Sequence, residues 1–188
     1  MQRKRGFTLI EMVVTITVLG ILLGFIYGTL IYQQRNANLQ IEYTVFSQKL
    51  QSFIGFFKTR VREIGYDPFE TNAYGIINGD STILRYNADD NGNGDFSDDL
   101  PHQFTFNTGK IYYDGSPLIS NIDTFKLSYY DFSDDSIPSI VQEVDTVNHT
   151  SSPVVRRVHY KVTGGKTVFG KKISVSYKGD VIIKNRGL

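Results

Sequence analysis

An apolar segment near the N-terminus constrains this chain more than any other feature. It runs from Phe7 to Tyr32, follows three basic residues between Arg3 and Arg5, and contains one charged side chain, that of Glu11. As a helix rising about 1.5 Å per residue, it exceeds the roughly 30 Å of a bilayer's hydrocarbon core. We therefore predict a membrane-spanning helix with a cytoplasmic N-terminus and the remaining chain outside, because basic residues stay on the cytoplasmic side.

Glu11 is the residue that a simple membrane anchor does not explain. A charged group in hydrocarbon costs several kcal/mol unless it is paired, and within the apolar segment the sequence supplies no partner for Glu11. We therefore expect its partner on another molecule. A cleaved secretory signal fits less well, because the run is long for such a signal and no Ala-x-Ala-like site follows it. A plain signal anchor remains the alternative.

The residues from Arg5 to Val14, in order Arg-Gly-Phe-Thr-Leu-Ile-Glu-Met-Val-Val, resemble the class III signal of type IV pilins and pseudopilins. In that family a prepilin peptidase cuts after the glycine and methylates the new terminal amine. The resemblance implies cleavage between Gly6 and Phe7, and it implies that Glu11 meets the Phe7 amine of a neighbouring subunit. The physics agrees, since the new cation would neutralise a buried carboxylate.

The same resemblance implies a function. The chain would be a structural subunit of a type IV pilus or a type II secretion pseudopilus, assembled from the membrane with other pilin subunits by an inner-membrane platform. Three further segments resemble the J-type minor pseudopilins and related minor pilins, which implies a low-copy subunit. These segments are Asn121 to Asp131, Val155 to Val158 and Asn185-Arg186.

Enzymatic chemistry is not expected. The sequence has no His-Glu-x-x-His pattern and no Gly-x-Ser-x-Gly elbow, and its lack of cysteine excludes thiolate metal sites. Two other functions stay open. One is a competence-type minor pilin whose basic strands between Arg156 and Arg186 contact DNA phosphates. Their charges alternate with apolar residues, as on any solvated strand face, so nucleic acid is not the expected partner. The other is a membrane-anchored adhesive or binding module.

Hydrophobic periodicity predicts the fold class. From residue 33 to residue 65, apolar residues recur at steps of three and four, as on one face of a helix. They are Leu39, Tyr43, Phe46, Leu50, Phe53, Phe57, Val61 and Ile64. After Pro68 the period becomes two, which predicts strands at 81–86, 103–106, 110–113, 124–132, 154–163, 172–177 and 181–184. Glycine-containing turns are predicted between them, including turns at 164–165 and 178–180.

We therefore predict an α+β protein. Its long N-terminal helix spans the membrane in the first half, is amphipathic in the second half, and packs on an antiparallel β-sheet domain. The predicted segments are a leader at 1–6, a transmembrane and filament-core helix at 7–32, its amphipathic continuation at 33–65, and a globular β domain at 66–188.

A loop rich in Asp, Asn and Gly, from Asn87 to Asp99, is a candidate calcium site. Calcium takes six to eight hard oxygen ligands, and glycine lets a tight loop point several of them inward. A register starting at Asn87 and one starting at Asp89 both resemble calcium loops, and we prefer the second. The candidate ligands are Asp89, Asn91, Asn93, Asp95, Asp98 and Asp99. The ion would be structural; the alternative is a solvated acidic turn.

Charge is strongly segregated along the chain. Residues 67–145 contain fifteen acidic and three basic side chains, whereas residues 146–188 contain nine basic and one acidic. Two interpretations remain open. The two segments neutralise each other within one fold, or an acidic face of one copy meets a basic face of a neighbour.

Overall fold

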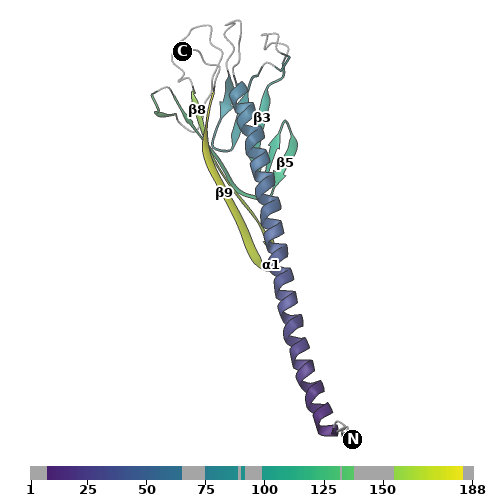
Figure 1. Cartoon of the computed structure of the whole chain (residues 1–188). Helices are drawn as coiled ribbons and strands as arrows, with labels where there is room; N and C mark the ends of the chain where they lie inside the picture. The colour runs from purple at the N-terminus through teal and green to yellow at the C-terminus, as the bar shows by residue number, and fades with distance from the viewer. Residues whose placement is uncertain are drawn as a thin grey trace, which may run out of the picture. The chain divides into compact units, whose positions relative to one another are not determined.

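The computed structural model describes residues 8–64, 75–88, 90–91, 99–131, 133–137 and 155–183 (Figure 1). The chain divides into two compact units, Met1–Glu42 and Tyr43–Leu188. One helix, α1 (Leu9–Glu63), contributes its first part to the first unit and its last part to the second. In the first unit the helix has an apolar stretch long enough to cross a membrane, and none of that stretch is buried within the protein.

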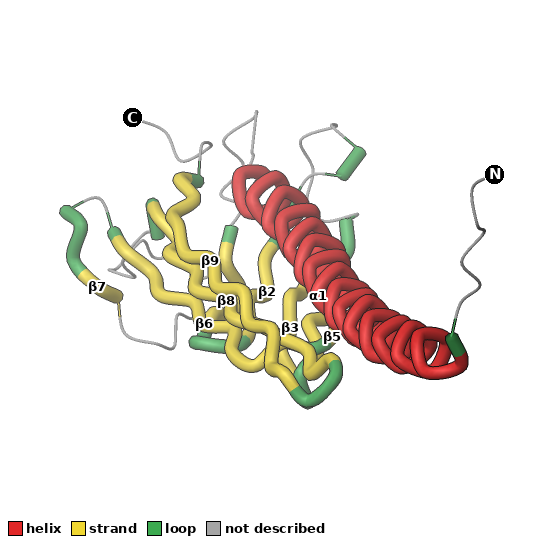
Figure 2. Tube along the Cα trace, turned by 60° about the horizontal axis from the view of Figure 1, so that its bottom comes forward, coloured by secondary structure: helices red, strands yellow, loops and turns green. Residues whose placement is uncertain are grey.

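The second unit contains the end of α1 and two antiparallel sheets. The described strands are β1 (Ile76–Gly79), β2 (Ile83–Tyr86), β3 (His102–Asn107), β4 (Lys110–Tyr113), β5 (Ser116–Ser120), β6 (Ile122–Tyr130), β7 (Ser136–Ile137), β8 (Arg157–Val168) and β9 (Lys171–Ile182). One sheet has the order β1-β2-β3-β4-β5 and the other β7-β6-β8-β9 (Figure 2). The predicted α+β class, with a long N-terminal helix on antiparallel sheet, is confirmed.

Phe57 lies at the centre of the core and contacts both sheets. Its ring centroid lies 5.1 Å from that of Phe104 in β3, 5.9 Å from that of Phe125 in β6 and 5.7 Å from that of Tyr160 in β8. Most of the predicted helix stripe is buried with it, namely Phe46, Leu50, Phe53, Val61 and Ile64. Tyr43 is an exception: it is 48% exposed, because burial of this helix face begins at Phe46.

Two predicted turns are wrong. Gly164 and Gly165 lie inside β8, and Gly179 lies inside β9. These glycines are needed for close approach rather than for turning: a Cβ on Gly165 would meet the Ile173 carbonyl of β9, and one on Gly179 would lie 2.7 Å from the Tyr160 hydroxyl oxygen. The two strands instead continue for twelve residues each.

β5 is a strand that the sequence pattern did not predict. It lies at the edge of its sheet, pairs with β4, and contains Pro117 opposite Tyr112. Proline lowers the strand propensity of a segment, yet an edge strand tolerates it because one side of that strand has no ladder to complete. The pairing shifts register between Ile111 and Tyr112, next to the proline.

Candidate functional site

Thr8 and Glu11 form a reciprocal cap at the start of α1. The Thr8 backbone N–H and hydroxyl group both donate to Glu11 Oε2, at 2.9 Å and 3.0 Å. In return, the Glu11 backbone N–H lies 3.4 Å from the Thr8 hydroxyl oxygen. This capping box satisfies donors that the first helical turn would otherwise leave unpaired. It also fixes the Glu11 carboxylate at the N-terminal end of the helix.

Sequence reasoning missed Thr8 as a partner of Glu11. The Thr-x-x-Glu spacing that announces a capping box was present and would have identified it. Thr8 is neutral, however, so it supplies hydrogen bonds and no counter-charge. The predicted processing residues Gly6 and Phe7 lie outside the described residues, and the pairing of Glu11 with a Phe7 amine stays a prediction.

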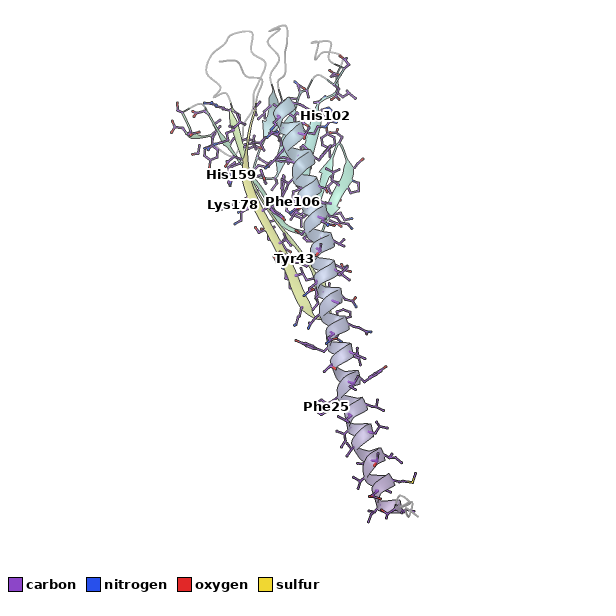
Figure 3. The ribbon with its side chains drawn as sticks, in the orientation of Figure 1. Phe25, Tyr43, His102, Phe106, His159 and Lys178 are labelled. Carbon is purple, nitrogen blue, oxygen red and sulfur yellow. The ribbon has the colours of Figure 1, made fainter. Side chains whose placement is uncertain are left out.

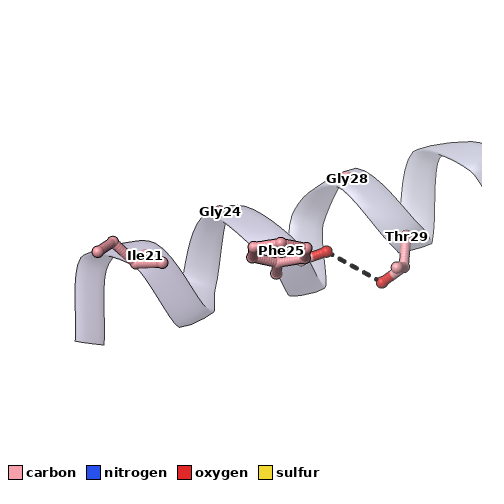
Figure 4. A pocket seen from close by; sticks show the side chains of 5 residues that line it. All are labelled: Ile21, Gly24, Phe25, Gly28 and Thr29. Atoms are coloured by element: carbon pink, nitrogen blue, oxygen red, sulfur yellow. Dashed lines mark hydrogen bonds between the residues drawn. The ribbon is translucent and has the colours of Figure 1, made fainter. Parts of the chain in front are cut away.

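The apolar part of α1 has a shallow hollow on one side. Gly24 and Gly28 leave it open, and Ile21, Phe25 and Thr29 line it (Figure 4). The Thr29 hydroxyl group donates its hydrogen bond within the helix, to the carbonyl oxygens of Phe25 and Ile26. A Cβ added at either glycine would meet nothing within 4 Å. The hollow is therefore a place where the helix backbone is accessible.

The candidate calcium loop is only partly described. Asp89, Asn93, Asp95 and Asp98 lie outside the described residues, whereas Asn91 and Asp99 lie within them. The Asp99 carboxylate accepts the backbone N–H of Asp90 at 3.2 Å. The described part of the chain contains no group of three or more acidic or histidine side chains arranged to hold a metal ion. The calcium site therefore stays a prediction.

Asp90, within this loop, belongs to an ion-pair network that sequence reasoning missed. Its carboxylate lies 2.8 Å from His102 Nε2 and 3.7 Å from an Arg60 guanidinium nitrogen. The other ring nitrogen of His102, Nδ1, lies 2.7 Å from Asp114 Oδ2. Each ring nitrogen of His102 therefore lies within hydrogen-bonding distance of a carboxylate oxygen. The network attaches one end of the acidic loop to the helix and to β3.

Three lysines form a row across the solvent-facing side of the four-stranded sheet. Lys126 in β6 pairs with Lys161 in β8, which pairs with Lys178 in β9. All three are exposed, and none has an ion-pair partner among the residues that the structure describes. The next row contains the His159–Asp180 pair, with 3.0 Å between Nδ1 and Oδ1; His159 and Lys178 are labelled in Figure 3. Like charges directly opposite destabilise a sheet, so this row costs stability.

The comparisons with known proteins identify the N-terminal segment. Residues 1–27 match the family described as the prokaryotic N-terminal methylation motif, which is the class III signal peptide of type IV pilins. No curated protein and no solved structure shows significant similarity to the chain. Helix α1 begins within this segment, and its last part packs on antiparallel sheet. Residues 1–27 therefore carry the N-terminal signal that type IV pilins share, and they support a pilin-like subunit that is processed by prepilin peptidase.

Proposed function

We propose that this protein is a minor structural subunit of a type IV pilus or a type II secretion pseudopilus. The observation that carries the proposal is the methylation motif at residues 1–27, which includes the start of helix α1. Its minor character is supported by the resemblance of 121–131 and 155–158 to J-type pseudopilins; the first of these segments contains β6, and the second leads into β8.

In this proposal the subunit waits in the membrane and then leaves it for the filament. Prepilin peptidase removes residues 1–6 and methylates Phe7. Thr8 then holds the Glu11 carboxylate at the end of the helix, and the Phe7 amine of a neighbouring subunit supplies the missing positive charge on assembly. The apolar side chains of α1, exposed in the single chain, pack against other subunits in the filament centre.

Intact-mass measurement of the protein purified from a host that carries prepilin peptidase tests this function. We expect a chain that starts at N-methylated Phe7. A Gly6→Val variant should retain residues 1–6, because a side chain at this position blocks the cleavage site. A wild-type chain that keeps Met1 in such a host would support the plain signal anchor instead.

The lysine row favours a second candidate, a minor pilin that contacts DNA. Lys126, Lys161 and Lys178 would neutralise backbone phosphates, and the logarithm of the binding constant would then fall linearly with the logarithm of salt concentration. Replacing all three by glutamine should reduce that slope by about 2–3, since each lost phosphate contact lowers it by roughly 0.9. Lys110→Gln, an exposed lysine in β4, is the control and should leave the slope unchanged. Equal slopes for the triple variant and the wild type would show that the lysine row does not contact DNA.

We also propose a structural calcium ion in the loop from Asp89 to Asp99. The proposal is supported by the density of oxygen ligands in the sequence: five Asp fall within these eleven residues and repel one another without a cation. Two of those carboxylates, on Asp90 and Asp99, already have partners within the protein. The proposed ligands are those predicted from the sequence, namely Asp89, Asn91, Asn93, Asp95, Asp98 and Asp99.

A further inference from the structure

The hairpin between β8 and β9 ends in a residue that its turn does not favour. Val168 pairs with Lys171, so the turn consists of Phe169 and Gly170, and both have positive φ, 49° and 76°. This conformation favours Asn or Asp followed by Gly, whereas a bulky residue at positive φ is strained. The corresponding turns at 108–109 and 114–115 place Thr and Asp at the strained position.

Core packing does not explain Phe169 either. Its side chain is 63% exposed. Among the described residues outside α1, it is the one aromatic side chain that is mostly exposed. A residue that violates turn chemistry and gains no burial in exchange is expected at a functional position, where strain is retained for another purpose.

Basic residues lie close to Phe169 along the chain. Lys171 follows the turn directly, Lys172 is the next residue, and Lys166 lies three residues before Phe169. Of these, Lys172 pairs with Asp123 at 3.1 Å. Residues 155–179 contain no acidic side chain at all. The tip thus combines an exposed aromatic ring with nearby cationic side chains, which is the combination that favours the boundary between lipid headgroups and acyl chains.

The contacts of β8 with the helix show which end of the second unit carries this tip. Tyr160 lies against Phe57, and Gly164, four residues later, lies against Phe46. β8 therefore runs antiparallel to α1, and its remaining residues continue from Phe46 in the direction of Tyr43 (Figure 1). The tip lies at the end of the unit where the chain enters from the apolar segment.

We propose that the β8–β9 tip binds the surface of an anionic membrane, with the Phe169 ring in the headgroup region and Lys171 beside anionic headgroups. This inference rests on the proposed function, because it requires the apolar segment to span a membrane before assembly. Before assembly, the membrane that the apolar segment spans is then always close to the subunit. Binding positions the sheets relative to the membrane until the subunit enters a filament.

The chain contains no tryptophan, so a single introduced tryptophan reports on its own surroundings. Phe169→Trp in the full-length chain is reconstituted into vesicles of phosphatidylcholine and phosphatidylglycerol. We expect blue-shifted emission and strong quenching by lipids brominated on their acyl chains. The control is Leu100→Trp, which replaces an 83% exposed residue next to the Arg60–Asp90–His102 network, towards the other end of the unit's helix. Its emission should stay red and unquenched.

Charge is tested in the Phe169→Trp background. Adding Lys171→Glu should weaken quenching in vesicles with phosphatidylglycerol and change it little in pure phosphatidylcholine. Unquenched, red emission from the Phe169→Trp variant would overturn the lipid contact, provided that the chain still resists extraction by alkaline carbonate. In that case the proposed function stands and only this inference fails. The measurement is repeated at a lower ratio of protein to lipid. If the quenching disappears at this ratio, the tip contacts a second copy of the chain, and the proposal is overturned.

Extraction of the chain by alkaline carbonate would be a different result. It would refute membrane residence, and with it both the proposed function and this contact. The two failures are therefore distinguishable by one fractionation on the same samples.

Discussion

The Tyr129 hydroxyl oxygen lies 3.0 Å from the carbonyl oxygen of Asp80 and 3.1 Å from that of Ile83. Tyr129 belongs to β6, whereas the two carbonyls flank the turn between β1 and β2, so this contact joins the two sheets. The ring also covers Gly79, where an added Cβ would lie 2.8 Å from Tyr129 Cζ. A polar group inside the core thus helps to fix how the sheets meet.

Tyr129→Phe should destabilise the protein by about 1 kcal/mol, because it removes a buried hydrogen bond and keeps the ring. Urea unfolding in a mild detergent, followed by the signal of the sheets, measures this. A variant as stable as the wild type would show that the sheets meet without the hydroxyl group.

The same residue predicts a pH dependence. Burial raises the pKa of the Tyr129 hydroxyl group above its ordinary value. The folded state therefore keeps this proton at a pH where the unfolded chain, with a tyrosine pKa of about 10, has lost it. The contribution of Tyr129 is complete below about pH 10 and falls as pH rises further. Tyr129→Phe should make the loss of stability above pH 10 less steep, and an unchanged slope would contradict this origin.

Two glycine substitutions should have opposite effects. Gly165→Ala places a Cβ against the Ile173 carbonyl of the neighbouring strand, and we expect destabilisation of about 1–3 kcal/mol. Gly55 is exposed on α1 with nothing within 4 Å of an added Cβ, so Gly55→Ala should stabilise by roughly 0.5–1 kcal/mol. Thermal unfolding of both variants beside the wild type checks this. If Gly165→Ala were as stable as Gly55→Ala, then Gly165 would not be required for the close approach of β8 and β9.

Glu11→Val should separate processing from assembly. The variant removes the only carboxylate of the apolar segment and makes the helix more apolar, so membrane insertion and leader removal should continue while incorporation into filaments falls strongly. Thr8→Val is the matched control: it removes the hydroxyl contact with Glu11 but keeps the charge, so incorporation should be reduced less. Intact mass measures processing, and the amount in sheared filaments measures incorporation. Full incorporation of Glu11→Val would show that the charge is dispensable.

Calcium should stabilise the full-length protein in detergent. An ion that binds only the folded state adds about 2.7 kcal/mol when its free concentration is a hundred times the dissociation constant. Magnesium should do much less, because its octahedral shell fits an open loop poorly. Asp89→Ala should remove most of the melting shift. Asp90→Asn should keep it, because the Asp90 carboxylate is already paired with His102. Equal melting temperatures in calcium and in chelator would refute the calcium site and show that the loop is only an acidic turn.

Local pattern predicted the helix and its buried face, because the spacing of Phe46, Leu50 and Phe57 reflects one element alone. The local pattern failed where residues from other strands determine the conformation. Gly165 and Gly179 have the local chemistry of turn residues, and only Ile173 and Tyr160 on the paired strands explain their role.

The candidate site divides in the same way. The methylation motif is contiguous, so the sequence was sufficient to find it. The network of Arg60, Asp90, His102 and Asp114 joins residues far apart along the chain, and no spacing rule predicts such a cluster. The strained Phe169 was missed because a turn was expected at the preceding glycines.

The position of Pro117 in β5 has a consequence for a chain that we propose to assemble into filaments. A free sheet edge is a template on which another chain can add a strand, and proline together with a shift in register makes such an edge a poor template. Growth through strand pairing would yield amyloid-like aggregates in place of ordered fibres. By blunting this edge, the chain disfavours self-association through strand pairing, and under the proposed function the helix directs assembly instead.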